Sequence, residues 1–154
     1  MQYKRSLAKG FTLIEVLLVI AILAILAAVV IVAINPAKQF STARDAQRRS
    51  DVYSILNALH QYALDNEGSF PDAITTEELE ICRTDSVSCD GKYDLSELTN
   101  DQVYLISVPI DPSCTASNVN CGDDETGYFL SKTDGGRISV VASDAENGEI
   151  SVTR

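Results

Sequence analysis

The sequence has little of what catalytic sites usually require. It contains one histidine, His60, so a Ser-His-Asp triad would have a single candidate base. None of its serines lies in a nucleophile-elbow motif. The Gly135-Gly136 pair stands between two predicted strands and is typical of a turn, not of a phosphate-binding loop. No enzymatic activity is predicted, and His60 is interpreted as a polar residue on the flank of a helix.

Basic residues are scarce beyond residue 34. The first ten residues carry three of the chain's 12 basic residues and no acid, and only Glu15 of its 22 acids precedes residue 35. Residues 35–154 therefore hold 9 basic and 21 acidic residues, a net charge of −12. This charge opposes binding to nucleic acid, where affinity comes mainly from neutralised phosphates. The acidity is interpreted as solvated surface, around a modest core of aliphatic and aromatic residues.

The segment from Val16 to Ile34 has no charged residue, no proline and no glycine. As a helix, these 19 apolar residues would span about 28 Å, close to the thickness of a bilayer core. The run also lacks the small-x-small cleavage site of an ordinary secretory signal, since Ile34 and Asn35 occupy those positions. We predict a membrane-spanning helix over residues 11–34 that is retained.

Two features at the start of this segment need an explanation beyond a plain anchor. A short leader with Lys4, Arg5 and Lys9 ends at Gly10, and Glu15 lies directly before the apolar run. A carboxylate at that depth is costly and needs a partner. One explanation is a capping box, in which Thr12 caps the helix and Glu15 reaches back to it.

The whole string KGFTLIEVL, from Lys9 to Leu17, resembles the class III signal of type IV pilins and type II secretion pseudopilins. Leader charge, Gly, Phe, Thr-Leu, Glu and the following apolar helix all occur in register. The resemblance implies that a membrane prepilin peptidase cuts between Gly10 and Phe11 and methylates the new N-terminal Phe11. It also implies that Glu15 acts in assembly and register, by pairing with the positive N-terminus of a neighbouring subunit.

The resemblance further implies partners and a location. The partners are the prepilin peptidase, the membrane, identical or homologous pilin subunits in a helical filament, and a pilus or secretion assembly machinery. The chain would be a single-pass membrane protein before assembly and part of a cell-surface filament afterwards. The alternatives are a type II secretion pseudopilin, and a minor pilin that serves as an adhesin or in DNA uptake.

The four cysteines fall into two pairs with six residues between partners: Cys82, Cys89, Cys114 and Cys121. Four cysteines permit three connectivities, of which local pairing is the simplest. A four-cysteine zinc site is the rival, although zinc ligands within a pair are usually separated by two to four residues. Disulfides would place the C-terminal body in an oxidising compartment outside the cytoplasm. The basic residues on both sides of the apolar run do not decide its orientation.

Beyond the apolar run, Asn35-Pro36 predicts a kink or the start of a second helical segment. Residues 35–66 are predicted to form an amphipathic helix, because apolar residues recur at three- and four-residue spacing from Val52 to Ala63. Its first half carries charges that are interpreted either as solvated surface or as contacts between subunits: Arg44, Asp45, Arg48, Arg49 and Asp51.

Residues 67–154 are predicted to form a small globular head. Strands are expected at 103–108, 128–131, 137–142 and 149–152, with a tight turn at Asn147-Gly148 between the last two. The fold class is α+β. A long N-terminal helix with an apolar transmembrane half and an amphipathic half packs on a small antiparallel sheet with disulfide-stapled loops.

No cofactor is predicted for this head, with calcium as the one alternative to solvated turns. Calcium takes six to eight oxygen ligands, and acidic residues gather in the C-terminal turns without EF-hand spacing. The residues considered are Asp123, Asp124, Glu125, Asp134, Asp144 and Glu146.

Overall fold

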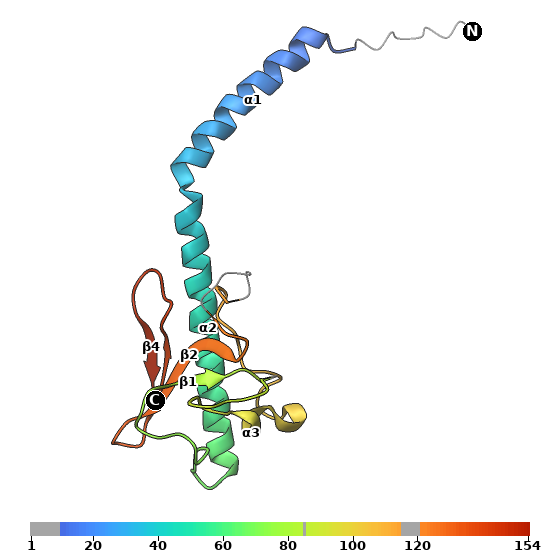
Figure 1. The fold of residues 1–154 in the computed structure, drawn as a ribbon. Helices are drawn as coiled ribbons and strands as arrows, with labels where there is room; N and C mark the ends of the chain where they lie inside the picture. The colour runs from blue at the N-terminus through green and yellow to red at the C-terminus, as the bar shows by residue number, and fades with distance from the viewer. Residues whose placement is uncertain (1–9, 85, 115–120) are drawn as a thin grey trace, which may run out of the picture. The chain divides into compact units, whose positions relative to one another are not determined.

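The structure, a computed structural model, describes residues 10–84, 86–114 and 121–154 (Figure 1). The chain divides into two compact units, Met1–Gln39 and Phe40–Arg154. The elements are α1 (Leu13–Ile34), α2 (Pro36–Asp65), β1 (Leu79–Cys82), α3 (Ser96–Thr99), a short 3-10 turn (Asn100–Gln102), β2 (Glu125–Lys132), β3 (Ile138–Ala142) and β4 (Ile150–Thr153). This α+β layout is the predicted fold class.

Helix α1 begins at a capping box and ends at Asn35. Asn35 adopts a left-handed conformation, with φ of 42°, which asparagine tolerates better than most residues. Helix α2 starts at the next residue, Pro36, where the missing N–H costs nothing because the first turn of a helix leaves that donor unpaired. The Asn35-Pro36 pair therefore separates two helices.

Helix α2 buries one apolar face, and a glycine follows its C-terminal end. The buried apolar residues include Val52, Ile55, Leu56 and Leu59, which repeat with helical spacing. After Asp65 the chain reverses, with Gly68 at φ 85° and its N–H donating to the carbonyl of Ala63 at 2.7 Å. A glycine with positive φ just beyond the last turn is a common helix ending.

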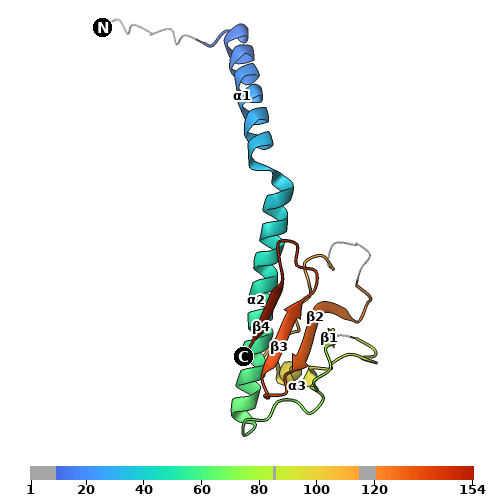
Figure 2. The same ribbon diagram turned by 90° about the vertical axis from the view of Figure 1, so that its left-hand side faces the viewer.

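The four strands form one antiparallel sheet in chain order, β1-β2-β3-β4 (Figure 2). Along β3, burial alternates from Ile138 to Val140 to Ala142, as expected for strands with one face on a core. The core joins the sheet to the apolar face of α2 and to the loops. Its members are Val52, Ile55, Leu56, Ala58, Leu59, Ile74, Ile81, Tyr93, Leu95, Leu98, Val108, Tyr128, Leu130, Ile138, Val140, Ala142 and Ile150.

The predicted strand at 103–108 is wrong, since this segment forms no strand in the structure. Two of its backbone donors bond nearby instead, Val103 to the carbonyl of Asn100 at 3.3 Å and Leu105 to the carbonyl of Leu98 at 3.0 Å. The N–H of Val108 donates to Oγ1 of Thr84 at 2.8 Å. The strand missing from the prediction is β1, at one edge of the sheet. Acidic residues surround it in the sequence, which is not typical of a strand. The carboxylate of Glu80 there accepts the N–H of Gly127 at 2.8 Å.

The turn predicted at Asn147-Gly148 is also wrong in its length. Strands β3 and β4 pair up to Ala142 and Ile150, so residues 143–149 form a wider loop between them. Asn147 uses its side chain to bond helix α2, as described below, and this contact takes the place of a two-residue turn.

Gly127 occupies a position where only glycine fits without strain. Its φ is +78°, and a Cβ there would lie 2.8 Å from the Cβ of Asp111. Gly136 in the β2–β3 turn offers a matched control, with φ of +80° and open space around the same position.

We predict that Gly127→Ala lowers the free energy of unfolding by about 3 kcal/mol, because backbone strain and a steric clash add. Gly136→Ala should cost only about 1 kcal/mol, from the left-handed backbone alone. Chemical denaturation of the full chain in detergent micelles measures both values. Equal costs for the two variants would contradict the role assigned to the contact with Asp111.

Candidate functional site

The N-terminal signal opens helix α1. Gly10 and Phe11 precede the helix, and the Phe11 side chain is 84% exposed. The leader residues Lys4, Arg5 and Lys9 lie outside the described residues. The peptide bond between Gly10 and Phe11 thus adjoins the first turn of α1, where the prediction places processing.

Glu15 lies in the first turn of α1 and takes part in a capping box. Its N–H donates to Thr12 Oγ1 at 3.3 Å, and its carboxylate accepts the N–H of Thr12 at 3.4 Å. Both distances exceed the usual range for such bonds, so the contacts are weak. No cation in the described part of the chain pairs with this carboxylate. The pairing of Glu15 with a neighbour's N-terminus stays a prediction.

Helix α1 has no buried residue. It is the one described helix that is long and apolar enough to cross a membrane. Large apolar side chains are exposed along its whole length, including Leu17, Leu23, Val29 and Val32. An apolar surface on every side of a helix requires lipid or other protein around it.

The second unit contains a buried cluster of charges around Arg48, which has 0% exposure. Its guanidinium makes two bonds to Asp111, Nε to Oδ2 at 2.6 Å and Nη2 to Oδ1 at 3.0 Å. It also contacts Asp45 at 2.8 Å, Glu146 at 3.2 Å and the hydroxyl of Ser113 at 2.6 Å. Arg48 therefore ties α2 to two loops that are far away in the sequence.

The interpretation of these α2 charges as solvated surface or as contacts between subunits is wrong for the buried members. Asp45, Arg48 and Asp51 are buried within the chain, and Arg44 pairs with Glu146. A buried charge needs partners, and here they come from loops that lie more than sixty residues away. Arg49, in contrast, is exposed.

The carboxylate of Asp45 is held by several donors from the β3–β4 loop. The N–H groups of Glu146 and Asn147 donate to it at 3.0 and 2.8 Å, and the side-chain amide of Asn147 donates at 2.8 Å. Burial would raise the pKa of Asp45, but these donors and the Arg48 guanidinium hold that pKa well below its usual range. Asp45 is therefore ionised whenever the head is folded at ordinary pH.

Tyr128 on β2 extends the same cluster. Its hydroxyl donates to Asp51 Oδ2 at 2.7 Å, and Gln47 donates to the other oxygen of that carboxylate at 2.8 Å. Burial and the carboxylate of Asp51 raise the pKa of the Tyr128 hydroxyl. The sheet thus contacts α2 through a polar bond as well as through the apolar core.

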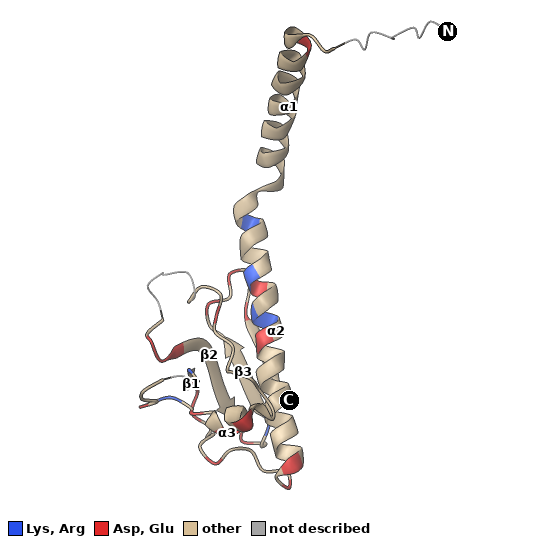
Figure 3. Cartoon of the chain, turned by 90° about the vertical axis from the view of Figure 1, so that its right-hand side faces the viewer, with Lys and Arg blue, Asp and Glu red and all other residues tan. Residues whose placement is uncertain are grey.

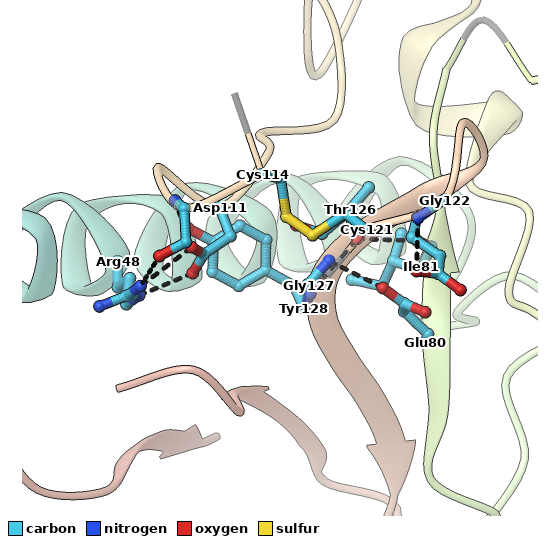
Figure 4. The surroundings of a disulfide bond; sticks show 12 residues. Arg48, Glu80, Ile81, Asp111, Cys114, Cys121, Gly122, Thr126, Gly127 and Tyr128 are labelled. Atoms are coloured by element: carbon cyan, nitrogen blue, oxygen red, sulfur yellow. Dashed lines mark hydrogen bonds and ion pairs between the residues drawn. A yellow bond between two sulfur atoms is a disulfide. The ribbon is translucent and has the colours of Figure 1, made fainter. Parts of the chain in front are cut away.

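The four cysteines form two local disulfides, Cys82–Cys89 and Cys114–Cys121. Because all four sulfurs are paired, the alternative of a zinc site is excluded. Figure 4 shows the second disulfide beside Asp111 and Gly127, with the guanidinium of Arg48 bonded to Asp111. The N–H of Cys114 donates to the carbonyl of Asp111 at 2.9 Å. This disulfide therefore begins at the loop that supplies the main partner of Arg48.

The acidic residues considered for calcium do not converge. Asp124 pairs with Lys92 at 3.3 Å, Glu125 accepts the N–H of Gly122, and Glu146 pairs with Arg44. Within the described ranges, no group of three or more His, Cys, Asp or Glu side chains is placed to hold a metal ion. His60 is half-buried and lies edge-on to Phe70, with ring centroids 5.7 Å apart.

We predict that Arg48→Met lowers the free energy of unfolding by about 3–5 kcal/mol, because it leaves buried carboxylates without their cation. Arg49→Met is the matched control, with the same substitution one residue along the helix at an exposed position. It should change stability by less than about 0.5 kcal/mol. Equilibrium unfolding of the full chain in detergent gives both values. A loss of less than about 1 kcal/mol from Arg48→Met would contradict the role assigned to the buried charges around Arg48.

The depressed pKa of Asp45 also predicts how stability depends on pH. Its folded pKa lies below the unfolded value, so the unfolded state binds more protons in acid and the stabilisation is lost as pH falls. The melting temperature should be nearly constant from pH 8 to about 5 and should fall below about pH 4. Asp45→Asn should melt lower at pH 7 and lose less in acid. An unchanged acid limb in that variant would argue against Asp45 as a source of the effect.

The comparison with known proteins bears on the N-terminal part of the chain. Residues 5–31 match the family described as the prokaryotic N-terminal methylation motif. No curated protein and no solved structure matches the chain. The match covers Arg5 and Lys9 of the leader, Gly10, Phe11, Glu15 and most of α1. Residues 5–31 therefore carry the class III signal peptide of type IV pilins and pseudopilins.

Proposed function

We propose that this chain is the structural subunit of a type IV pilus-like filament. It enters the membrane as a prepilin, is cut after Gly10, is N-methylated at Phe11 and polymerises through its N-terminal helix. The observation that carries the proposal is a helix with no buried residue, most of which lies within the matched methylation motif. In this role the chain is the substrate of the peptidase and the structural subunit of the filament, and it catalyses no reaction itself.

The exposed apolar surface of α1 must be kept from water at every stage, because each Å² of it that water reaches costs roughly 25 cal/mol. In the membrane, lipid covers this surface before assembly. In a filament, the α1 helices of neighbouring subunits cover one another, so the same side chains serve first as an anchor and then as the filament core.

Glu15 supplies register in this proposal. A free ammonium at Phe11 and a carboxylate at Glu15 each carry a desolvation penalty in an apolar bundle, and pairing offsets much of it. A subunit out of register leaves both charges unpaired. The weak capping bonds to Thr12, at 3.3 and 3.4 Å, leave the carboxylate available for such a partner.

The chain is then organised into four parts. Residues 1–10 form the leader, residues 11–34 the anchor and later the filament core, residues 35–66 the second helix, and residues 67–154 the head. The two disulfides support a head outside the cytoplasm, where thiols oxidise. The N-terminal helix crosses the membrane before assembly, and the assembled filament lies at the cell surface.

A type II secretion pseudopilin is the second candidate, because the matched signal belongs equally to pseudopilins. The two roles differ in abundance. A major pilin should dominate fibres that are sheared from the cell surface. A pseudopilin should be scarce in that fraction, and its deletion should stop the secretion of exported proteins.

We predict that Glu15→Ala leaves membrane insertion and cleavage intact but stops incorporation into filaments, because the neighbour's N-terminal charge loses its partner. The measurement is the amount of subunit in sheared filaments, with mass spectrometry of the mature N-terminus. Gly10→Glu is the control for the earlier step and should accumulate as a precursor that keeps residues 1–10. A normal filament yield from Glu15→Ala would refute the register role.

A further inference from the structure

One stretch of α2 lacks charge altogether. From Val52 to Leu64 the sequence contains no Asp, Glu, Lys or Arg, although 22% of the chain is charged. Part of this stretch packs on the core, and the rest is exposed. We call the exposed residues the outer face: Tyr53, Ser54, Asn57, Gln61 and Leu64. A solvated helix face normally carries charged residues, so this composition is unusual for a surface that meets only water.

The outer face has the shape and composition of a contact surface. A groove of about 590 Å³ runs between Ser54, Asn57 and Gln61 on the helix and the loop at Val103–Leu105. Two large side chains of the outer face are also exposed. Tyr53 is 52% exposed and Leu64 is 78% exposed. Depletion of charge together with exposed tyrosine and aliphatic groups is typical of the centre of protein interfaces.

Charges of opposite sign border this face. Arg49 precedes it, while Asp65 and Glu67 follow it; Figure 3 shows basic residues in the first half of α2 and acid at its end. Asp65 lies in the last turn of the helix, where the helix dipole disfavours a carboxylate. It accepts a bond from the Tyr104 hydroxyl at 3.0 Å, but no basic side chain in the described ranges pairs with it. An acid at position 65 therefore does not stabilise its own helix.

We propose that the outer face is the contact surface for a second copy of this chain, displaced along the helix axis. In this arrangement Arg49 of one copy lies beside Asp65 of another copy, which is a different neighbour from the one whose N-terminus meets Glu15. The proposal rests on the filament function and names the surface through which the heads meet. Copies that leave one membrane are parallel, so without displacement Arg49 would face Arg49 and acid would face acid. A shift of 16 positions, about 24 Å at 1.5 Å per residue, brings opposite charges together.

The same shift places a suitable occupant on the outer face. Phe40 of the displaced copy comes level with Leu56 and Asn57, next to the groove. Phe40 is 64% exposed and has no core role in its own chain. Its exposed neighbours Ala43, Ala46 and Gln47 are small or uncharged, so they let two helices approach closely. An exposed aromatic next to a groove in which Asp65 is the one charged lining residue is the pairing expected at an interface hot spot.

Charge reversal tests the proposed contact in assembled filaments. Arg49→Asp and Asp65→Arg should each lower the yield of sheared filaments about tenfold or more, and the double variant should recover most of the loss. Arg137→Asp is the control for an exposed arginine elsewhere on the head, and it should assemble normally. Double-variant filaments no better than the single variants would overturn the pairing.

Cross-linking tests the displacement. The native cysteines are all in disulfides, so a thiol-specific bifunctional reagent reacts only with introduced cysteines. Phe40→Cys combined with Asn57→Cys should give a ladder of linked subunits in intact filaments. Asn57→Cys alone should stay monomeric, and an efficient dimer from it would overturn the shift. If the wild-type chain forms no filament, the proposed function itself fails; if it does and the variants assemble unchanged, only this inference fails.

Discussion

A guanidinium removed from water must be surrounded by acceptors, and Arg48 meets this requirement by drawing two remote loops onto helix α2. Its partners Asp111 and Glu146 lie 63 and 98 residues away in the sequence. Removing such a charge from its partners costs several kcal/mol, so the bonds act together. The loop that leads into the Cys114–Cys121 disulfide and the loop between β3 and β4 are positioned by this one side chain. The sheet reaches α2 through the core and through Tyr128.

The two units meet opposite physical demands. The unit from Phe40 to Arg154 closes around its own core and pairs its buried charges internally. The apolar helix α1 has no buried residue, and its surface calls for a partner outside the chain. A folded head attached to such a helix is what a subunit needs when it is stored in a membrane and later built into a bundle. In the proposed function, the cut after Gly10 is the step that frees the amine for the carboxylate of Glu15.

Local patterns were enough to predict the N-terminal half of the molecule. Each of its features depends on residues close together in the sequence: the apolar run, the signal around Gly10 and the amphipathic spacing of α2. The structure contains both predicted helices. The head was harder, because its contacts are non-local. The segment 103–108 has strand-like residues, but its N–H groups bond nearby carbonyls and the side chain of Thr84 and pair with no strand. Strand β1 is a true edge strand, but the acidic residues beside it are not typical of a strand. The partners of Arg48 could not be read from α2 alone.

The internal pairing of the α2 charges bears on how copies of an acidic head can meet. A net charge of −12 over residues 35–154 makes heads repel one another at short range. A contact surface that adds no acid avoids most of this cost, and the outer face of α2 has none between Val52 and Leu64. Because Asp45, Arg48 and Asp51 are used within the chain, Arg49 is the exposed cation left next to that face. One complementary pair at the edge of a neutral surface can define a register without making the heads adhere in other arrangements.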